Sequence, residues 1–306
     1  MATESAPHPG TVLITGASTG IGAAAALRLD RAGWRVFGGV RKPADGEALR
    51  AQASGRLQPV IIDVTDRASI DAAAAEVTRA VGAAGLSGLV NNAGVSVPGP
   101  VELLPIDDLR RQLEVNVIGQ VAVTQAFMSL VRAARGRVVF ISSIGGRFST
   151  PFLGAYCASK FALEAIGDAM RIEVRPWGIH VALVEPGSIQ TPFWDKGMSD
   201  AETMEGQLTP EGHALYDDAI ASVKAVARDF ERRGIPPDAV ARAIEHAVAS
   251  PRPKTRYLVG GDARLQAALV TWLPDRMLDG LVARQLKLPK TAKDAAPAAR
   301  TKEPVA

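Results

Sequence analysis

The sequence contains little of several residue types, and each shortage excludes a class of protein. Among 306 residues there is a single cysteine, Cys157, so neither an internal disulfide framework nor a multi-cysteine metal site can form. No run of about eighteen uninterrupted apolar residues occurs, so we expect no transmembrane segment. The first ten residues are polar and hold two prolines, with no apolar stretch of signal-peptide length. These shortages predict a soluble, cytoplasmic protein without a metal.

The net charge of the chain is also small. The formal net charge is +3, and residues 287–306 carry five basic and two acidic side chains, which accounts for all of it. Both this basic tail and residues 1–10 are expected to be disordered, because they are polar and poor in large apolar residues. The alternative for the tail is contact with an anionic surface. The near-neutral body gives no support to nucleic-acid binding.

Short apolar runs alternate with longer helix-like runs over the first 260 residues, which is typical of βαβ units. Continuous apolar runs such as VVFI and VALV predict strands covered by helices on both faces. The sequence therefore predicts a single α/β domain over residues 11–286, with a seven-stranded parallel sheet. The strands are expected at Thr11–Thr15, Trp34–Val40, Pro59–Val64, Gly88–Asn91, Arg137–Ser142, Ile179–Glu185 and Arg256–Val259, and the helices at Ile21–Ala32, Ser69–Val81, Asp107–Ala134, Tyr156–Val174 and Pro237–Ala249.

The pattern loosens between residues 188 and 234, where turn residues and scattered aromatics precede one final helical piece. A stretch of that length is either disordered or functional, and we interpret residues 188–234 as a substrate lid. After the seventh strand the chain is apolar again and broken by Pro274. Core packing, a subunit contact and contact with a membrane surface all remain open for residues 265–281.

A glycine-rich turn follows the first strand and leads into an alanine-rich helix. Gly16, Gly20 and Gly22 allow a sharp turn and leave bare backbone, while the helix offers unpaired N–H groups to a phosphate. This predicts a dinucleotide site in which Ser18 donates to phosphate. The same residues match G-x-S-x-G, the nucleophile elbow of serine hydrolases. Only about ten residues precede the first strand, so no earlier strand could supply the oxyanion hole that this elbow needs, and His180, His213 and His246 are poorly placed as a base.

Tyr156 and Lys160 stand four positions apart in a chain with only three tyrosines. Side chains at this spacing share a helix face, so both can act on one ligand. A phenol that takes a proton near neutral pH needs a pKa lowered by about three units, or about 4 kcal/mol. A cation about 4 Å away at an effective dielectric near 20 supplies energy of that order. The alternative is a half-buried tyrosine beside a solvated lysine.

Four motifs in this order resemble the short-chain dehydrogenase/reductase family: Thr15-Gly16-Ala17-Ser18-Thr19-Gly20-Ile21-Gly22, Asn91-Asn92-Ala93-Gly94, Tyr156-x-x-x-Lys160 and Pro186-Gly187. The resemblance spans residues 11 to about 262. It implies a Rossmann-type doubly wound sheet, nicotinamide chemistry and a tyrosine acid/base. The cofactor-binding residues that it implies are Gly16, Ser18, Thr19, Gly20, Ile21, Gly22, Arg41, Asp63, Asn91, Ala93, Tyr156, Lys160, Pro186, Gly187, Ser188 and Thr191.

The resemblance also implies two further catalytic residues beside Tyr156 and Lys160. Ser143, thirteen residues before Tyr156, would donate to the substrate oxygen as it becomes alkoxide-like. Asn116 interrupts an apolar helical run and would support a relay water near the lysine. The alternative for Asn116 is a structural cap or a kink.

The choice of cofactor depends on the end of the second strand. NAD-specific sites place an acidic residue about twenty positions past the glycine turn, whereas a 2′-phosphate needs a guanidinium. Val40 stands at the family's acidic position and Arg41 follows it, so NADP(H) is preferred, with NAD(H) as the alternative. Arg41 and Lys42 could otherwise serve only to solubilise a loop.

Aromatic side chains in the expected lid, Phe193 and Trp194, suggest an apolar pocket beside Ser143. The carboxyl-terminal part resembles the retinol and hydroxysteroid dehydrogenase branch of the family, so we predict a retinoid-, steroid- or lipid-like secondary alcohol or ketone as substrate. By the same resemblance a homo-oligomer is expected. The alternative to an enzyme is a non-catalytic regulatory or scaffold protein that binds NADP(H).

Overall fold

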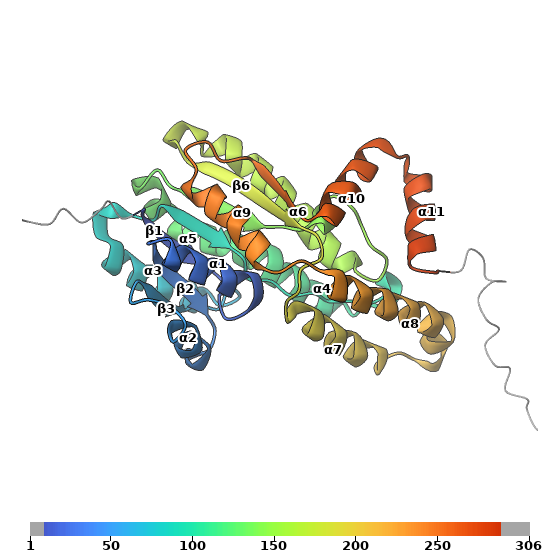
Figure 1. Cartoon of the computed structure of the whole chain (residues 1–306). Helices are drawn as coiled ribbons and strands as arrows, with labels where there is room; N and C mark the ends of the chain where they lie inside the picture. Colours follow the sequence, from blue (N-terminus) through green and yellow to red (C-terminus); the bar gives the residue numbers. More distant parts are fainter. Residues whose placement is uncertain (1–8, 289–306) are drawn as a thin grey trace, which may run out of the picture.

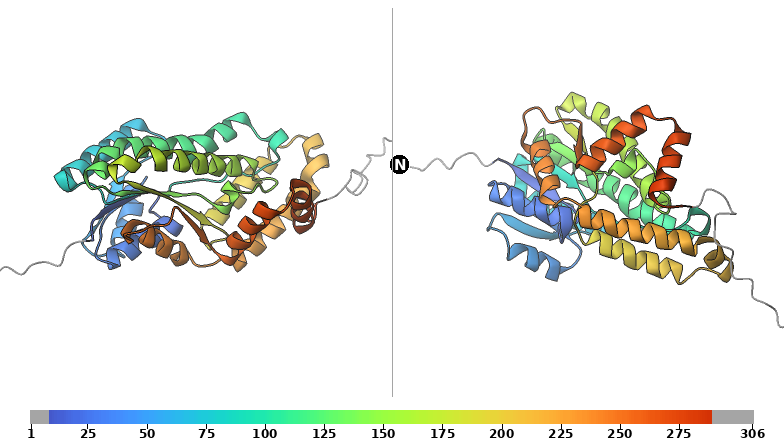
Figure 2. Two further views of the ribbon diagram at one scale, coloured as in Figure 1. Left: turned by 90° about the horizontal axis from the view of Figure 1, so that it is seen from above. Right: turned by 45° about the vertical axis from the view of Figure 1, so that its right-hand side comes forward.

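The structure is a computed structural model, and it describes residues 9–288 (Figure 1). The predictions for residues 1–8 and for most of the basic tail, residues 289–306, lie outside the described residues. Two layers of helices enclose one sheet (Figure 2). The α/β fold class and the Rossmann-type arrangement are thereby confirmed.

The sheet has seven strands in the order β3-β2-β1-β4-β5-β6-β7, and every neighbouring pair is parallel. The winding reverses between β1 and β4, where Val12 lies opposite Gly88, so the carboxyl ends of these two strands open on a switch-point crevice. Six of the seven strands end within one residue of their expected ends, and the third ends three residues early. The strands are β1 Thr11–Ile14, β2 Arg35–Val40, β3 Leu57–Ile61, β4 Gly88–Asn91, β5 Arg137–Ile141, β6 His180–Pro186 and β7 Arg256–Val259.

The two faces of the sheet bury separate clusters of apolar side chains. Along β1, Val12 and Ile14 face one cluster and Leu13 faces the other, because side chains alternate along a strand. The first face is covered by α1 (Gly20–Arg31), α2 (Pro43–Arg50) and α9 (Asp238–Ala249), and the second by α3 (Arg67–Val81), α5 (Gly119–Ala133) and α6 (Gly154–Glu173).

The long helix expected over residues 107–134 is interrupted. It consists of α4 (Ile106–Leu113), a π-helical turn at Glu114–Ile118 and α5. Asn116 lies in the π turn and is fully buried. The helix expected over residues 107–134 thus runs through Ile106–Ala133, but it is not a regular α-helix throughout, because the π turn with the buried Asn116 lies at its centre.

The segment after β6 contains two helices where the sequence suggested one. These are α7 (Phe193–Glu205) and α8 (Pro210–Arg233), which pack together and are joined by an ion pair between Lys224 and Glu205. They project beyond the carboxyl ends of the strands (Figures 1 and 2). The sequence pattern was misleading because few of their side chains are fully buried. After β7 come α10 (Gly261–Trp272) and α11 (Asp275–Gln285), separated at Pro274.

Short helical turns occur at Gly82–Ala84, Val101–Leu103, Ile144–Gly146 and Arg175–Trp177. One continuous helical stretch, Ile106–Ala133, is long and apolar enough to cross a membrane by length and composition alone. Its apolar side, which includes Val123 and Phe127, packs in the core against the sheet. A core helix of a globular protein passes the same test, so this stretch is only weak support for a membrane span.

Candidate active site

The glycine turn after β1 forms a bare backbone cradle. Gly16 and Gly20 have φ angles of +65° and +57°, which L side chains rarely adopt. A Cβ on Gly22 would come within 2.2 Å of the Gly16 carbonyl oxygen, and one on Gly16 within 2.8 Å of the Ala93 Cα. Thr19 caps α1 without a side-chain hydrogen bond, which leaves the first N–H groups of the helix available. These features fit a pyrophosphate, with Ser18 and Thr19 exposed beside it.

Hydrogen bonds from the loop after β4 hold this cradle in place. The Thr15 hydroxyl oxygen accepts from the backbone N–H groups of Asn92 (3.0 Å) and Ala93 (3.1 Å). The Asn92 amide donates to the carbonyl oxygens of Thr15 (2.9 Å) and Gly16 (3.0 Å). Asn92 was missed as a site residue, although it stands inside the asparagine motif that the sequence displays.

Asn91, expected beside the adenosine ribose, lies in the core instead. It has no exposed surface, and its amide donates to the hydroxyl of Thr124 on α5 at 2.8 Å. The Asn91 side chain is thus covered by α5, and a contact of this residue with the cofactor stays a prediction. Ala93, two residues later, is partly exposed and contacts the glycine turn.

The ends of β2 and β3 place a cation near a carboxylate. Arg41 directly follows β2 and is exposed. Asp63 follows β3 and accepts from the backbone N–H of Thr65 at 2.9 Å and from its hydroxyl at 2.7 Å. Burial works against ionisation of Asp63, but the hydrogen bonds from Thr65 and the charge of Arg41 keep its pKa below the ordinary value. Among residues 9–288 Arg41 forms no ion pair, so its exposed guanidinium could meet an anion beside Asp63.

The three expected catalytic side chains of β5 and α6 meet at one point. A Cβ on Gly145 would come within 3.4 Å of both the Ser143 hydroxyl oxygen and the Tyr156 ring, so these two side chains are neighbours, and the Ser143 oxygen accepts from the Gly145 N–H at 3.0 Å. Lys160 is buried, donates to the Ile141 carbonyl oxygen at 2.8 Å, and lies 5.6 Å from the centre of the Tyr156 ring. Ser143, Tyr156 and Lys160 therefore lie together.

The protonation of these groups differs from the sequence expectation. Burial raises the pKa of Tyr156 to about 12, and the hydrogen bond with Ser143 offsets only part of that rise. Burial also lowers the pKa of Lys160 to about 8, against the opposing charge of Glu164. The pKa of Tyr156 is thus raised in this structure, where the sequence predicted a lowering, because the loss of solvation on burial is the largest influence on it. At neutral pH this site holds a neutral phenol beside a cation.

Asn116 connects the loop after β4 to α6. Its oxygen accepts from the Val95 N–H at 2.8 Å, and its amide donates to the Val95 carbonyl and to the Ser159 hydroxyl, both at 3.0 Å. Ser159 in turn donates to the Tyr156 carbonyl at 2.6 Å. The side chain thus has the structural role that the alternative reading described, within a π turn. Its support of a relay water stays a prediction.

The turn after β6 brings the opposite wall to the glycine cradle. A Cβ on Gly20 would come within 3.3 Å of the Thr191 side chain, so the two turns are in contact. Asp262, at the start of α10, accepts from the Ser188 N–H at 2.7 Å and lies where a Cβ on Gly187 would be, within 2.2 Å. Asp262 was also missed, since no periodicity or motif marks it. Pro186, the last residue of β6, is buried behind this turn.

Helix α7 contributes one aromatic side chain to the site. The Phe193 ring centre lies 5.8 Å from that of Tyr156. Trp194 instead donates its indole N–H to the Ile189 carbonyl at 2.8 Å, which fastens α7 to the turn after β6.

Comparison with known proteins places this geometry in context. The family model for short chain dehydrogenase matches residues 10–202. The chain belongs to the short-chain dehydrogenase family. It is 37% identical to the NADPH-dependent 3-dehydrocapnine reductase of Ornithobacterium rhinotracheale, across 90% of this chain and 96% of that protein. It is 38% identical to retinol dehydrogenase 5 of Homo sapiens, across 92% and 90%. The crystal structure of a short-chain dehydrogenase from Streptomyces avermitilis superposes with a TM-score of 0.71 at 29% identity, covering 94% and 97%.

Membership of the short-chain dehydrogenase family decides between the functions that the sequence left open. The prediction of a nicotinamide-dependent alcohol or ketone oxidoreductase is confirmed, and both the scaffold and the hydrolase alternatives are wrong. The histidines agree with this outcome, because His213 contacts Asp217 and His246 contacts Tyr257, each at 2.8 Å. Neither contact involves Ser18.

Proposed function

We propose that this short-chain dehydrogenase reduces a ketone on a largely apolar molecule to a secondary alcohol, with NADPH as the electron donor. The same site would run the reverse oxidation. The observation that carries this proposal is the meeting of Ser143, Tyr156 and Lys160 beside the glycine cradle. NADPH, when bound, supplies the hydride.

The side chains of this chain perform the proton chemistry. The Tyr156 phenol, with a pKa near 12, is protonated at neutral pH and can donate its proton to the oxygen of a carbonyl group. The Ser143 hydroxyl donates to the same oxygen as negative charge develops on it. The buried Lys160 cation stabilises the tyrosinate that remains.

The cofactor choice is supported by the donors at the end of β2. The glycine cradle would hold the pyrophosphate, and the exposed Arg41 guanidinium would meet a 2′-phosphate. Val40, at the family's acidic position, offers no carboxylate for a 2′-hydroxyl. The capnine reductase relative is NADPH-dependent by name. NADP(H) is therefore the preferred cofactor, and NAD(H) the weaker one.

The substrate class is supported by the lining and by the relatives. The Phe193 ring lies beside the Tyr156 ring, and α7 and α8 would form the lid, which suits an apolar body next to the reacting carbon. The two relatives are named for 3-dehydrocapnine and for retinol. We propose a retinoid-, steroid- or lipid-like molecule. Arg147 offers no clamp for a substrate carboxylate, because it is paired with Glu185.

Location and assembly complete the proposal. A cytoplasmic protein agrees with the single buried cysteine, Cys157. A homo-oligomer agrees with two large apolar side chains exposed on α6, Phe161 and Ile172. Light scattering after gel filtration measures the assembly, and a monomer would contradict that part of the proposal.

The test is consumption of NADPH, followed by its absorbance with a panel of apolar ketones. Tyr156→Phe removes the proton donor and should lower kcat by about a thousandfold, since general acid catalysis contributes on that order. Tyr257→Phe is the matched control: it removes a buried phenol whose hydrogen bonds within residues 9–288 are with His246 and the Lys254 N–H, and it should keep kcat. Activity in Tyr156→Phe equal to that of the control would contradict the proposal.

A further inference from the structure

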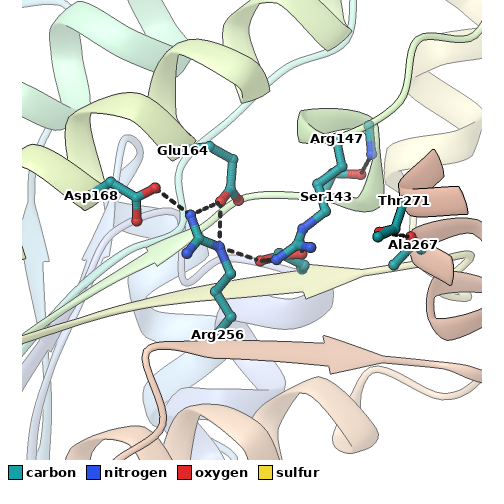
Figure 3. Close-up of polar contacts among 9 residues, drawn as sticks. Ser143, Arg147, Glu164, Asp168, Arg256, Ala267 and Thr271 are labelled. Atoms are coloured by element: carbon teal, nitrogen blue, oxygen red, sulfur yellow. Dashed lines mark hydrogen bonds and ion pairs between the residues drawn. The ribbon is translucent and has the colours of Figure 1, made fainter.

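Five charged side chains form an ion cluster near Ser143, and none of them takes part in the proposed proton transfer. We define the ion cluster as Arg147, Glu164, Asp168, Glu185 and Arg256. Figure 3 shows Arg256 reaching from β7 between Glu164 and Asp168 of α6, with Arg147 next to Ser143. Glu185 has no exposed surface and Glu164 is nearly buried. Such charges are costly to bury unless each is paired.

Two of the three carboxylates in the ion cluster form an ion pair with a second arginine besides Arg256. Glu185 is held by Arg147, with contacts of 2.5 and 3.1 Å, as well as by Arg256 at 3.2 Å. Asp168 is held by Arg171 at 2.6 Å as well as by Arg256 at 2.6 Å.

Glu164 differs, because within residues 9–288 its ion pairs are with Arg256 alone, at 3.1 and 3.2 Å. Its other oxygen, Oε1, is buried without a hydrogen-bond partner.

Glu164 stands one helical turn after Lys160 on the same helix. Side chains at this spacing lie side by side, and the charge of Glu164 already acts on the Lys160 ammonium. Both side chains are buried, so a direct ion pair between them would face little competition from water. Such a pair would neutralise the cation that Tyr156 requires and would draw it toward Glu164.

We infer that Arg256 is a positioning residue for the reaction: by holding Glu164 in the ion cluster, it keeps that carboxylate away from Lys160 and leaves the lysine to Tyr156. Arg256 touches neither the substrate nor the reacting atoms and acts through Glu164. The other carboxylates of the ion cluster do not need this restraint, because each keeps a second base. Glu164 thus becomes harmful only when its partner is lost.

The test is a double-mutant cycle on kcat for ketone reduction at neutral pH. Arg256→Met should lower kcat by about twentyfold, because an orphaned buried carboxylate then takes the nearest cation. Glu164→Gln alone should leave kcat within about threefold of the parent, since its amide can still accept from Arg256. Glu164→Gln combined with Arg256→Met should recover kcat to within about threefold of Glu164→Gln. A role confined to packing would make the double variant no better than Arg256→Met.

Asp168→Asn combined with Arg256→Met is the matched control, because it removes a different carboxylate of the ion cluster and should give no recovery. If Arg256→Met fails to fold, Arg256→Lys replaces it in the combinations with Glu164→Gln and with Asp168→Asn. Arg256→Lys still tests the inference, because one ammonium group cannot pair with three carboxylates at once. Full activity in the single Arg256 variant, or equal recovery by Asn at 168, would overturn the inference.

This inference rests on the proposed roles of Tyr156 and Lys160. The experiments distinguish failure of the proposed function from failure of the inference about Arg256. Activity in Tyr156→Phe would remove the proposed function. An inactive Tyr156→Phe together with no recovery by Glu164→Gln would remove only the role of Arg256.

Discussion

Removal of the Asp262 carboxylate should disturb the turn that follows β6 without touching Tyr156. Asp262 accepts from the N–H groups of Ser188 at 2.7 Å and of Ala263 at 2.9 Å. It also fills the space beside Gly187 and Gly260, where added Cβ atoms would come within 2.2 and 2.4 Å of its oxygen. In Asp262→Ala the Ser188 N–H loses its acceptor and Gly187 loses the group that fixes its position.

The size of the effect follows from these contacts. A hydrogen bond to a charged acceptor contributes about 1.5–3 kcal/mol, and Asp262 is only partly buried, so about 2 kcal/mol of restraint on the turn is a reasonable value. A displacement of about 1 Å between reacting groups can cost a hundredfold in rate. We therefore expect hydride transfer to slow by about thirtyfold in Asp262→Ala.

The assay is single-turnover reduction followed by NADPH absorbance, with NADPH affinity measured separately by fluorescence. Asp262→Asn keeps an oxygen that accepts from Ser188, so it should lose much less than the alanine variant. Asp275→Ala, an exposed acidic residue in the first turn of α11, is the control for the substitution itself. Hydride transfer at the parental rate in Asp262→Ala would refute the assignment of this carboxylate to the turn.

Two further predictions concern the cofactor and the buried lysine. Arg41→Ala should weaken the binding of NADPH by about tenfold to a hundredfold and change the binding of NADH little, because only the 2′-phosphate of NADPH loses a partner. Lys42→Ala is the matched control. Equal losses of affinity for both cofactors in binding titrations would contradict the role of Arg41. Burial lowers the pKa of Lys160 to about 8, below its unfolded value, so between those values the unfolded chain binds more protons and stability rises with pH. From about pH 7.5 to 9.5 the free energy of unfolding, measured with urea, should rise by about 2 kcal/mol more in the parent than in Lys160→Met. If the free energy of unfolding changed equally with pH in both proteins, the pKa of Lys160 would not be lowered in the folded state.

Local patterns in the sequence were enough for the sheet and for most of the site. The continuous apolar strands and the glycine turn predicted a parallel sheet with a dinucleotide crevice, because burial on both faces and bare backbone are properties of the segments themselves. The spacing of Tyr156 and Lys160 was equally informative, since a helix fixes which side chains are neighbours four residues apart. Ser143 was reached through the family resemblance.

The remaining features depend on contacts between segments far apart in the chain. Few side chains of α7 and α8 are fully buried, and these helices are joined by the ion pair between Lys224 and Glu205, which no local pattern displays. The core position of Asn91 follows from the packing of Thr124 against β4.

The amino-acid sequence by itself determined the order of strands and helices, the glycine cradle and the pairing of Tyr156 with Lys160 on one helix face, because these depend on short-range spacing. Only the tertiary structure decided how those side chains ionise and what restrains them. The neutral phenol of Tyr156 results from burial by the whole fold. The contacts of Asp262 with Ser188 and of Arg256 with Glu164 join residues 74 and 92 positions apart, a distance that no local pattern spans.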